Sequence, residues 1–316
     1  MTKYIIKRIL YALPTLFLVM TIVFFMLHVI GGSPVYSMVD MSDISQEELD
    51  ALNAKYGFDR PIIVQYADYL KGVITGNWGT SYFDGKDVFQ NILDHMEPTI
   101  LITICSTLIT VLIGVPIGII AATNRNSWLD YTLSTTSMVF LTIPTFWLGV
   151  MMVYFLAFKL HLFPTQGYHN IAKYGLKEAL SYVAMPSLAL GMTHVANIAR
   201  NTRSSMLDVL GEDYIRTARA KGLPMRKVYF KHALRNVIAL IAMLISSSVV
   251  GMLGGSTVVE NVFNIDGIGK YAYHALLRRD YTQEQAILLF MSIIYVVMNM
   301  IMDIIHKMID PRVDFS

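Results

Sequence analysis

Charged residues are scarce in this chain: they make up 15% of its 316 residues, whereas an average soluble domain has about 25%. Hydrophobic residues make up 54%. The one cysteine, Cys105, excludes an intramolecular disulfide framework and a cysteine-rich metal site. The sequence has no GxSxG or HExxH motif, and its eight histidines are scattered, so no catalytic or metal-binding residues are expected. This composition indicates an integral membrane protein.

Six apolar stretches are long enough to span a membrane, because about 20 helical residues cover a hydrocarbon core of about 30 Å. The first follows Lys3, Lys7 and Arg8, as in a signal peptide, but its length and the missing cleavage site predict a retained span. The fourth is the weakest, because it is short and contains Pro186 and His194. The stretches lie at about 9–30, 99–122, 131–157, 182–199, 237–259 and 285–303.

The distribution of lysine and arginine predicts the orientation of these spans. With the N-terminus inside, fifteen of the 25 Lys and Arg residues fall on cytoplasmic segments, nine of them between Arg200 and Arg235. Both termini are therefore expected in the cytoplasm. The fold class is an all-α integral membrane protein with six transmembrane helices. Its expected parts are a first helix (1–30), a small extracytoplasmic lobe (31–98), a five-helix core (99–307) and a cytoplasmic tail (308–316).

Two signals indicate that the lobe is folded. Ser45 and Glu48 have the spacing of a capping box, which predicts a helix start. GNWGTSY at 76–82 is typical of a glycine-rich turn, with Trp78 suited to the membrane interface.

A basic stretch, DYIRTARAKGLPMRKVYFKHALRN at 213–236, lies between the fourth and fifth spans and carries seven Lys and Arg but one acid. Asp213–Lys221 lacks helix breakers, and its acid favours a helix N-terminus. Gly222 and Pro224 end that helix, and a second is expected from Pro224 to Asn236. The stretch therefore predicts a cytoplasmic elbow of two helices.

Three functions fit such an elbow. Nucleic-acid binding requires base-reading or stacking groups beside a basic face, and this elbow has few aromatic residues. A positive loop attracted to anionic lipid explains the charge without a further function. A docking elbow for a cytoplasmic partner also explains the small residues, which let a partner approach closely. The residues alone leave the last two functions open.

The elbow resembles the ATPase-coupling motif of permeases from binding-protein-dependent ABC importers, E-A-A-x3-G-x9-I-x-L-P. Aligned on Gly222, the chain also matches the motif at Ala218 and Leu234 and departs from it elsewhere. It is closer to the dipeptide, oligopeptide and nickel branch, whose version is similar to DYIRTARAKGL followed by KHALRN. Further segments similar to that branch, of the first-permease type, are KRILYALPTL, VIGGSP, GNWGTSY, IPTFWLG, MPSLALG, VENVFNIDGIGK and DPR.

The resemblance implies a type I ABC importer permease fold in the plasma (inner) membrane of a prokaryote. It implies four kinds of partner: a second permease subunit, two cytoplasmic ATPases, an extracytoplasmic substrate-binding protein and membrane lipid. ATP and Mg would bind to the ATPases, because GIGKY at 267–271 lacks the first Gly and the Ser/Thr of a phosphate-binding loop. No enzyme activity, cofactor or nucleic acid is expected for this chain.

In this family an elbow inserts into a groove on the ATPase. By that resemblance Ala218, Ala220, Gly222 and Leu223 would fill the groove, with three cations at its rim. The residues expected to couple to the ATPase are Arg216, Thr217, Ala218, Arg219, Ala220, Lys221, Gly222, Leu223 and Pro224.

The translocation path is marked less clearly. Serines and glycines of the fifth span predict either close helix packing or a substrate route. GVPIG at 114–118 favours packing. Glu260 and His28 are expected at solvated span ends, whereas His194 lies deeper and is a candidate for a polar path. The possible pathway residues are His194, Ser247, Gly251 and Gly255.

The cargo implied by the resemblance is a di- or oligopeptide, with a nickel chelate or another small solute as the alternative. The second permease is expected to differ in sequence, giving a heterodimer, although a homodimer stays open. A secondary transporter would show two related halves, and a channel a repeated pore segment, and neither pattern is visible.

Overall fold

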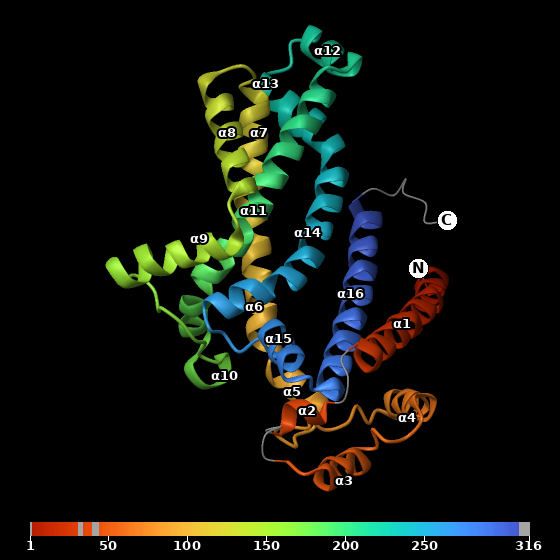
Figure 1. Cartoon of the computed structure of the whole chain (residues 1–316). Helices are drawn as coiled ribbons and strands as arrows, with labels where there is room; N and C mark the ends of the chain where they lie inside the picture. The colour runs from red at the N-terminus through yellow and green to blue at the C-terminus, as the bar shows by residue number, and fades with distance from the viewer. Residues whose placement is uncertain (1, 31–33, 40–43, 310–316) are drawn as a thin grey trace. The chain divides into compact units, whose positions relative to one another are not determined.

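The computed structural model describes residues 2–30, 34–39 and 44–309, without the side chains of residues 2–6, 9, 30, 306 and 309 (Figure 1). Across these residues the regular structure is helical, apart from an isolated β-bridge between Thr80 and Asp87. The all-α prediction is confirmed for this part of the chain. The DPR segment, the glycines of VIGGSP and most of the expected tail at 308–316 lie outside the described residues.

The chain divides into two compact units, Met1–Glu97 with Gly267–Val297 and Pro98–Asp266 with Met298–Ser316. The four parts expected from the sequence stay a prediction. The first unit contains α1 (Thr2–Ile30), α2 (Val35–Met38), α3 (Gln46–Tyr56), α4 (Ile62–Thr75), α5 (Val88–Asp94), α15 (Ile268–Arg278) and the beginning of α16 (Tyr281–Ile309).

The second unit holds the longest helix, α11 (Leu176–Leu210), and three π-helical segments labelled η. Its other elements are α6 (Met96–Ile109), η1 (Thr110–Gly114), α7 (Val115–Thr123), α8 (Trp128–Thr142), α9 (Thr145–Met152), η2 (Val153–Lys159), α10 (Ile171–Tyr174), α12 (Asp213–Ala220), α13 (Met225–Lys227), η3 (Val228–Ala233) and α14 (Leu234–Val262).

Five helical segments of the described chain are long and apolar enough to cross a membrane, and they match five of the six expected spans. They are Leu10–Val29, Val88–Thr123, Leu176–Leu210, Met225–Val262 and Tyr281–Ile305. The third expected span, 131–157, is sharply bent, because α8 and the segment from α9 to η2 meet at an angle of 100°. If this bent pair is one span, the total is six.

Pro144 causes the bend, which is much sharper than an ordinary kink. Ile143 is extended, with ψ of 124°, as expected for a residue that precedes proline. Pro144 is also extended and begins α9 without an N–H to donate. Both peptide units therefore leave the helical path between α8 and α9.

Glycines bring the end of η1 and α7 into backbone contact with α11. A Cβ added to Gly118 would lie 2.5 Å from the carbonyl oxygen of Ala199, and one at Gly114 would lie 3.0 Å from that of Val195. The π-helical turn η1 ends directly before α7, where Pro116 supplies no N–H to the helix. The packing interpretation of GVPIG is confirmed.

Within the first unit, Asp280 links the turn after α4 to the start of α16. Its carboxylate accepts hydrogen bonds from the hydroxyl of Ser81 at 2.6 Å and the N–H of Tyr82 at 3.2 Å. It also accepts a bond from the N–H of Gln283, at 3.2 Å, in the first turn of α16. The capping box of Ser45 and Glu48 at the start of α3 is confirmed.

Trp78 is half-buried and packs against the apolar core of the first unit, and its expected place at a membrane interface stays a prediction. Its ring lies 5.1 Å from that of Phe89 on α5 and 6.3 Å from that of Phe290 on α16. The turn itself is built as expected, since Gly79 has φ of +87° and its N–H donates to the side chain of Asn77.

Candidate functional site

The basic elbow is present as two helical segments joined by a tight turn. α11 ends at Gly211, Glu212 is extended, and α12 begins with Asp213. The N–H of Gly222 donates to the carbonyl of Arg219, and Gly222 adopts φ of +73°, which a residue with a Cβ adopts at a cost. The chain then passes through α13 and η3 into α14, as predicted for the second helix.

One face of α12 packs against the rest of the second unit. Ile215 is fully buried and Ala218 is 8% exposed. They join an apolar cluster that includes Ile119 of α7, Met206 of α11 and Val237 of α14. A hydrogen bond of 2.8 Å between the side chains of Asn236 and Tyr214 adds a second link to α14. The elbow is therefore fixed to α7, α11 and α14.

The other face of α12 is open. Arg216, Thr217, Arg219 and Ala220 on α12 and Lys221, Gly222 and Pro224 after it are exposed. Arg216 makes one exposed ion pair, 3.3 Å, with Asp213 one turn earlier.

Of the nine residues expected to couple to the ATPase, seven are exposed and two are not. The Ala218 side chain packs inward, and Leu223 is half-buried against the same cluster. Ala218 and Leu223 were expected to fill the ATPase groove, but both pack against their own unit. Ile215 and Ala218 are three residues apart, which places both on the face of α12 toward the core of the second unit. The spacing of three was a readable signal in the sequence.

Three of the four candidate pathway residues lie where α11 meets α14. A Cβ added to Gly251 would lie 3.5 Å from the imidazole of His194, and one at Gly255 would lie 3.2 Å from Leu190. Ser247 is exposed one turn before Gly251. The glycines therefore allow close packing of the two helices at the level of His194.

α14 also has a face without neighbours in the second unit. Ser247, Gly251, Gly254 and Val258 are exposed at a spacing of three to four residues, which places them on one side of the helix. A Cβ added to Gly254 would have no atom within 4 Å. His194 lies at the border of this open face. A partner helix or a translocation path could lie against the face without displacing any part of the second unit.

Two buried polar contacts were not found by sequence reasoning. Asp130 of α8 is 1% exposed and binds the guanidinium of Arg203 on α11 through two contacts, of 2.5 and 2.7 Å. Glu260 of α14 is fully buried and accepts a 2.7 Å hydrogen bond from Thr99 of α6. The expectation that Glu260 lies at a solvated span end is wrong, because a helix 161 residues earlier in the chain covers it.

Comparison with known families identifies the chain. The family model for the "binding-protein-dependent transport system inner membrane component" matches residues 114–315, and the corresponding N-terminal model matches residues 1–103. The chain belongs to this family. It is a multi-pass inner-membrane permease of an ATP-driven, binding-protein-dependent importer, so the secondary-transporter and channel alternatives are excluded. The family supplies the permease component of such importers and is not itself the catalytic component.

The matches to curated relatives span the whole length of the permease and the whole length of each relative. It is 34% identical to the oligopeptide transport system permease protein AppB of Bacillus subtilis over 317 residues. It is 33% identical to the dipeptide transport system permease protein DppB of Alkalihalophilus pseudofirmus and to the glutathione transport system permease protein GsiC of Escherichia coli. The resemblance to peptide-branch permeases is confirmed.

Solved structures show the same fold over most of the chain. An inward-facing structure of the MetNI methionine ABC transporter matches with a TM-score of 0.58 and 20% identity. It covers 70% of this permease and 97% of that chain. The fold of the larger part of the permease is therefore that of a known ABC importer.

Proposed function

We propose that this permease forms half of a translocation path for di- or oligopeptides. The observation that carries the proposal is the set of full-length relatives named for oligopeptide, dipeptide and glutathione transport, all of which are peptides. These names favour peptides over a nickel chelate. The partners are a second permease of different sequence, two cytoplasmic ATPases that bind ATP and Mg, and an extracytoplasmic binding protein.

In this proposal both termini and the elbow lie in the cytoplasm, and residues 31–98 form an extracytoplasmic lobe. The excess of Lys and Arg between Arg200 and Arg235 supports this orientation.

The exposed face of α12 is proposed to dock on an ATPase. Its side chains, with Lys221 and Gly222, present cations around small residues, which suits a groove with an acidic rim. The buried face, through Ile215 and Ala218, is fixed to α7, α11 and α14. Movement of the ATPase would thus be transmitted to the helices that carry His194 and Gly251.

The variant Gly222→Asp tests this docking role. A Cβ at Gly222 has no atom within 4 Å, so the carboxylate would occupy only the space needed by the ATPase. We expect normal amounts in the membrane, loss of co-purifying ATPase and a fall of peptide uptake by tenfold or more, about 1.4 kcal/mol of docking free energy.

Gly76→Asp is the matched control. Gly76 also ends a helix, has φ of +77° and has no atom within 4 Å of an added Cβ, so both variants carry the same backbone strain of about 1–2 kcal/mol. Uptake that falls equally in the two variants, or stays normal in Gly222→Asp, contradicts the docking role.

A further inference from the structure

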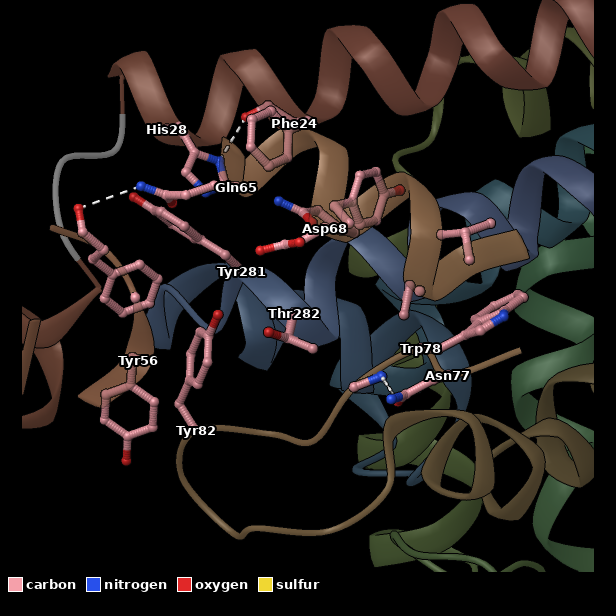
Figure 2. A pocket seen from close by; sticks show the side chains of 18 of the residues that line it. Phe24, His28, Tyr56, Gln65, Asp68, Asn77, Trp78, Tyr82, Tyr281 and Thr282 are labelled. Carbon is pink, nitrogen blue, oxygen red and sulfur yellow. Dashed lines mark hydrogen bonds between the residues drawn. The ribbon is translucent and has the colours of Figure 1, made fainter. Parts of the chain in front are cut away.

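The loop between α7 and α8, residues 124–127, carries a cation without a partner. Arg125 is exposed, and its guanidinium pairs with no acid among the residues that the structure describes. The exposed side-chain amide of Asn126 has no hydrogen bond in that part of the chain either. In contrast, the charges in the wall of the hollow beside the end of α1 (Figure 2) are paired, since Arg60 binds Asp68 at 2.7 Å. The loop is therefore the place where polar groups are left for a partner.

Hydrogen bonds fix the backbone of this loop. Asn124 closes α7, because its N–H and its side-chain amide both donate to the carbonyl of Ile120, at 3.1 and 2.9 Å. The N–H of Ser127 donates to the carbonyl of Asn124 at 3.1 Å. The Ser127 hydroxyl accepts a 3.2 Å bond from the N–H of Asp130 and so caps α8. A loop fixed in this way loses little conformational entropy when a partner binds to it.

Asp130 also ties the loop to α11. Its carboxylate accepts a 3.0 Å bond from the N–H of Asn126 and binds the guanidinium of Arg203 on α11. The hydroxyl of Ser134 donates a further bond of 3.3 Å. Because Asp130 is 1% exposed, removal of a partner would leave a buried charge uncompensated. The loop is thus linked directly to the helix that carries the elbow.

The loop lies at the same end of the second unit as the elbow (Figure 1). Ile119 and Ala122, near the end of α7, belong to the same buried apolar cluster as Ile215 and Ala218 of α12. Arg125 follows Ala122 by three residues. The exposed loop therefore continues the surface that begins with the open face of α12.

Two kinds of partner carry the charge to pair with Arg125: an anionic lipid headgroup and an acidic protein surface. A lipid requires no fixed backbone, because the long side chain of an arginine reaches a headgroup from many positions. A fixed loop that presents a carboxamide beside a guanidinium suits the polar rim of a protein interface. The rigidity of the loop and its place beside the elbow favour the protein.

We propose that Arg125 and Asn126 form a second contact with the ATPase that docks on the elbow. Arg125 pairs with a carboxylate of the ATPase, and Asp130 and Arg203 are positioning residues that hold the loop in register with α12. The proposal rests on the proposed docking of α12 and adds an attachment point on another pair of helices. One attachment point acts as a pivot, whereas two also transmit a rotation of the ATPase.

Photo-crosslinking tests the contact in the assembled transporter. In the cysteine-free background Cys105→Ser, the variant Arg125→Cys is labelled with a benzophenone maleimide and irradiated in nanodiscs. We expect a crosslinked product in which mass spectrometry finds the ATPase. Lys177→Cys, at an exposed cation near the other end of α11, is the matched control and should give no such product.

Binding of the purified ATPase to the permease in nanodiscs measures the strength of the contact. We expect Arg125→Glu to weaken binding by about three- to tenfold, because repulsion replaces attraction, and the difference should shrink as salt is added. Lys177→Glu makes the same change of charge and should bind the ATPase as the wild type does.

Asp130→Asn tests the positioning role, because it leaves the exposed side chains of the loop unchanged. It should weaken ATPase binding by about threefold through a looser loop, a smaller effect than charge reversal. Glu260→Gln makes a similar change at another buried carboxylate and should not affect ATPase binding. Unchanged binding in Asp130→Asn refutes the positioning role.

The loop contact is overturned if Arg125→Cys crosslinks to lipid or to the second permease and not to the ATPase. It is also overturned if Arg125→Glu binds the ATPase as tightly as the wild type. Loss of the ATPase in Gly222→Asp together with unchanged binding in Arg125→Glu refutes the loop contact and leaves the elbow docking in place. A crosslink from Arg125→Cys together with normal binding in Gly222→Asp refutes the elbow docking and supports the loop contact.

Discussion

At the scale of single residues, Asp280 combines complete burial with three hydrogen bonds. Its pKa lies above the ordinary value of 3.8, because burial disfavours the charged form and outweighs the bonds from Ser81 and the backbone. The folded protein then holds this proton more tightly than the unfolded chain. The contribution of this group to stability is therefore complete below pH 3.8 and is lost as the pH rises through the raised pKa.

The variant Asp280→Asn should therefore flatten the dependence of stability on pH. As the pH rises from 3.8 through the raised pKa, the wild type loses the stability contributed by proton binding at Asp280, whereas an amide has no proton to lose. Thermal unfolding of both proteins across this range measures the difference. Asp87→Asn, an exposed carboxylate at the start of α5, is the control and should follow the wild type. Parallel pH profiles for Asp280→Asn and the wild type would rule out this role.

At the scale of elements, the contact between α7 and α11 depends on the absence of a side chain. At Gly118 any Cβ meets the backbone of Ala199 and the Cβ of Thr202, both at 2.5 Å, and neither can rotate away. The two helices therefore have to separate to admit a larger residue.

We expect Gly118→Val to destabilise the permease by about 1–3 kcal/mol, the usual cost of overpacking. Gly254→Ala on α14 is the matched control, because an added Cβ there has no atom within 4 Å, and alanine favours a helix by up to about 1 kcal/mol. Melting temperatures of the purified variants measure both effects. A Gly118→Val protein as stable as Gly254→Ala would show that the helices are not in fixed contact.

The elements also show what the sequence could predict. Hydropathy located the long helices, because length and apolar content alone decide whether a segment can span. It did not give the sharpness of the bend at Pro144, since a proline that kinks a helix and one that breaks it look alike in sequence. It also missed the contacts of Glu260 and Arg203, whose partners lie on helices distant in the chain.

At the scale of the whole molecule, the orientation can be tested through cysteine. Cys105 is the chain's one thiol, it is partly buried within a span, and its replacement by serine gives a cysteine-free background. We expect Gly76→Cys to react with a membrane-impermeant maleimide in intact cells, because residue 76 belongs to the segment that we propose as an extracytoplasmic lobe. Lys221→Cys should react only after the membrane is permeabilised.

Both sites are exposed in this chain, and labelling of Lys221→Cys after permeabilisation shows that its lack of labelling in intact cells reports the side of the membrane and not burial. Labelling of Lys221→Cys in intact cells would reverse the topology and remove the elbow from any ATPase. The positive-inside pattern was readable in the sequence because it depends on a count of charges and not on packing.

The length of α11 has a mechanical consequence. Its 35 residues make a rod of about 52 Å at 1.5 Å per residue, and the elbow is attached to one end. If the rod pivots at its Leu176 end by about 10°, the elbow end sweeps about 9 Å, by the same geometry. His194 lies near the middle of the rod and travels about half as far. Such a lever converts a large displacement at the elbow into a smaller displacement, with a larger force, beside Gly251.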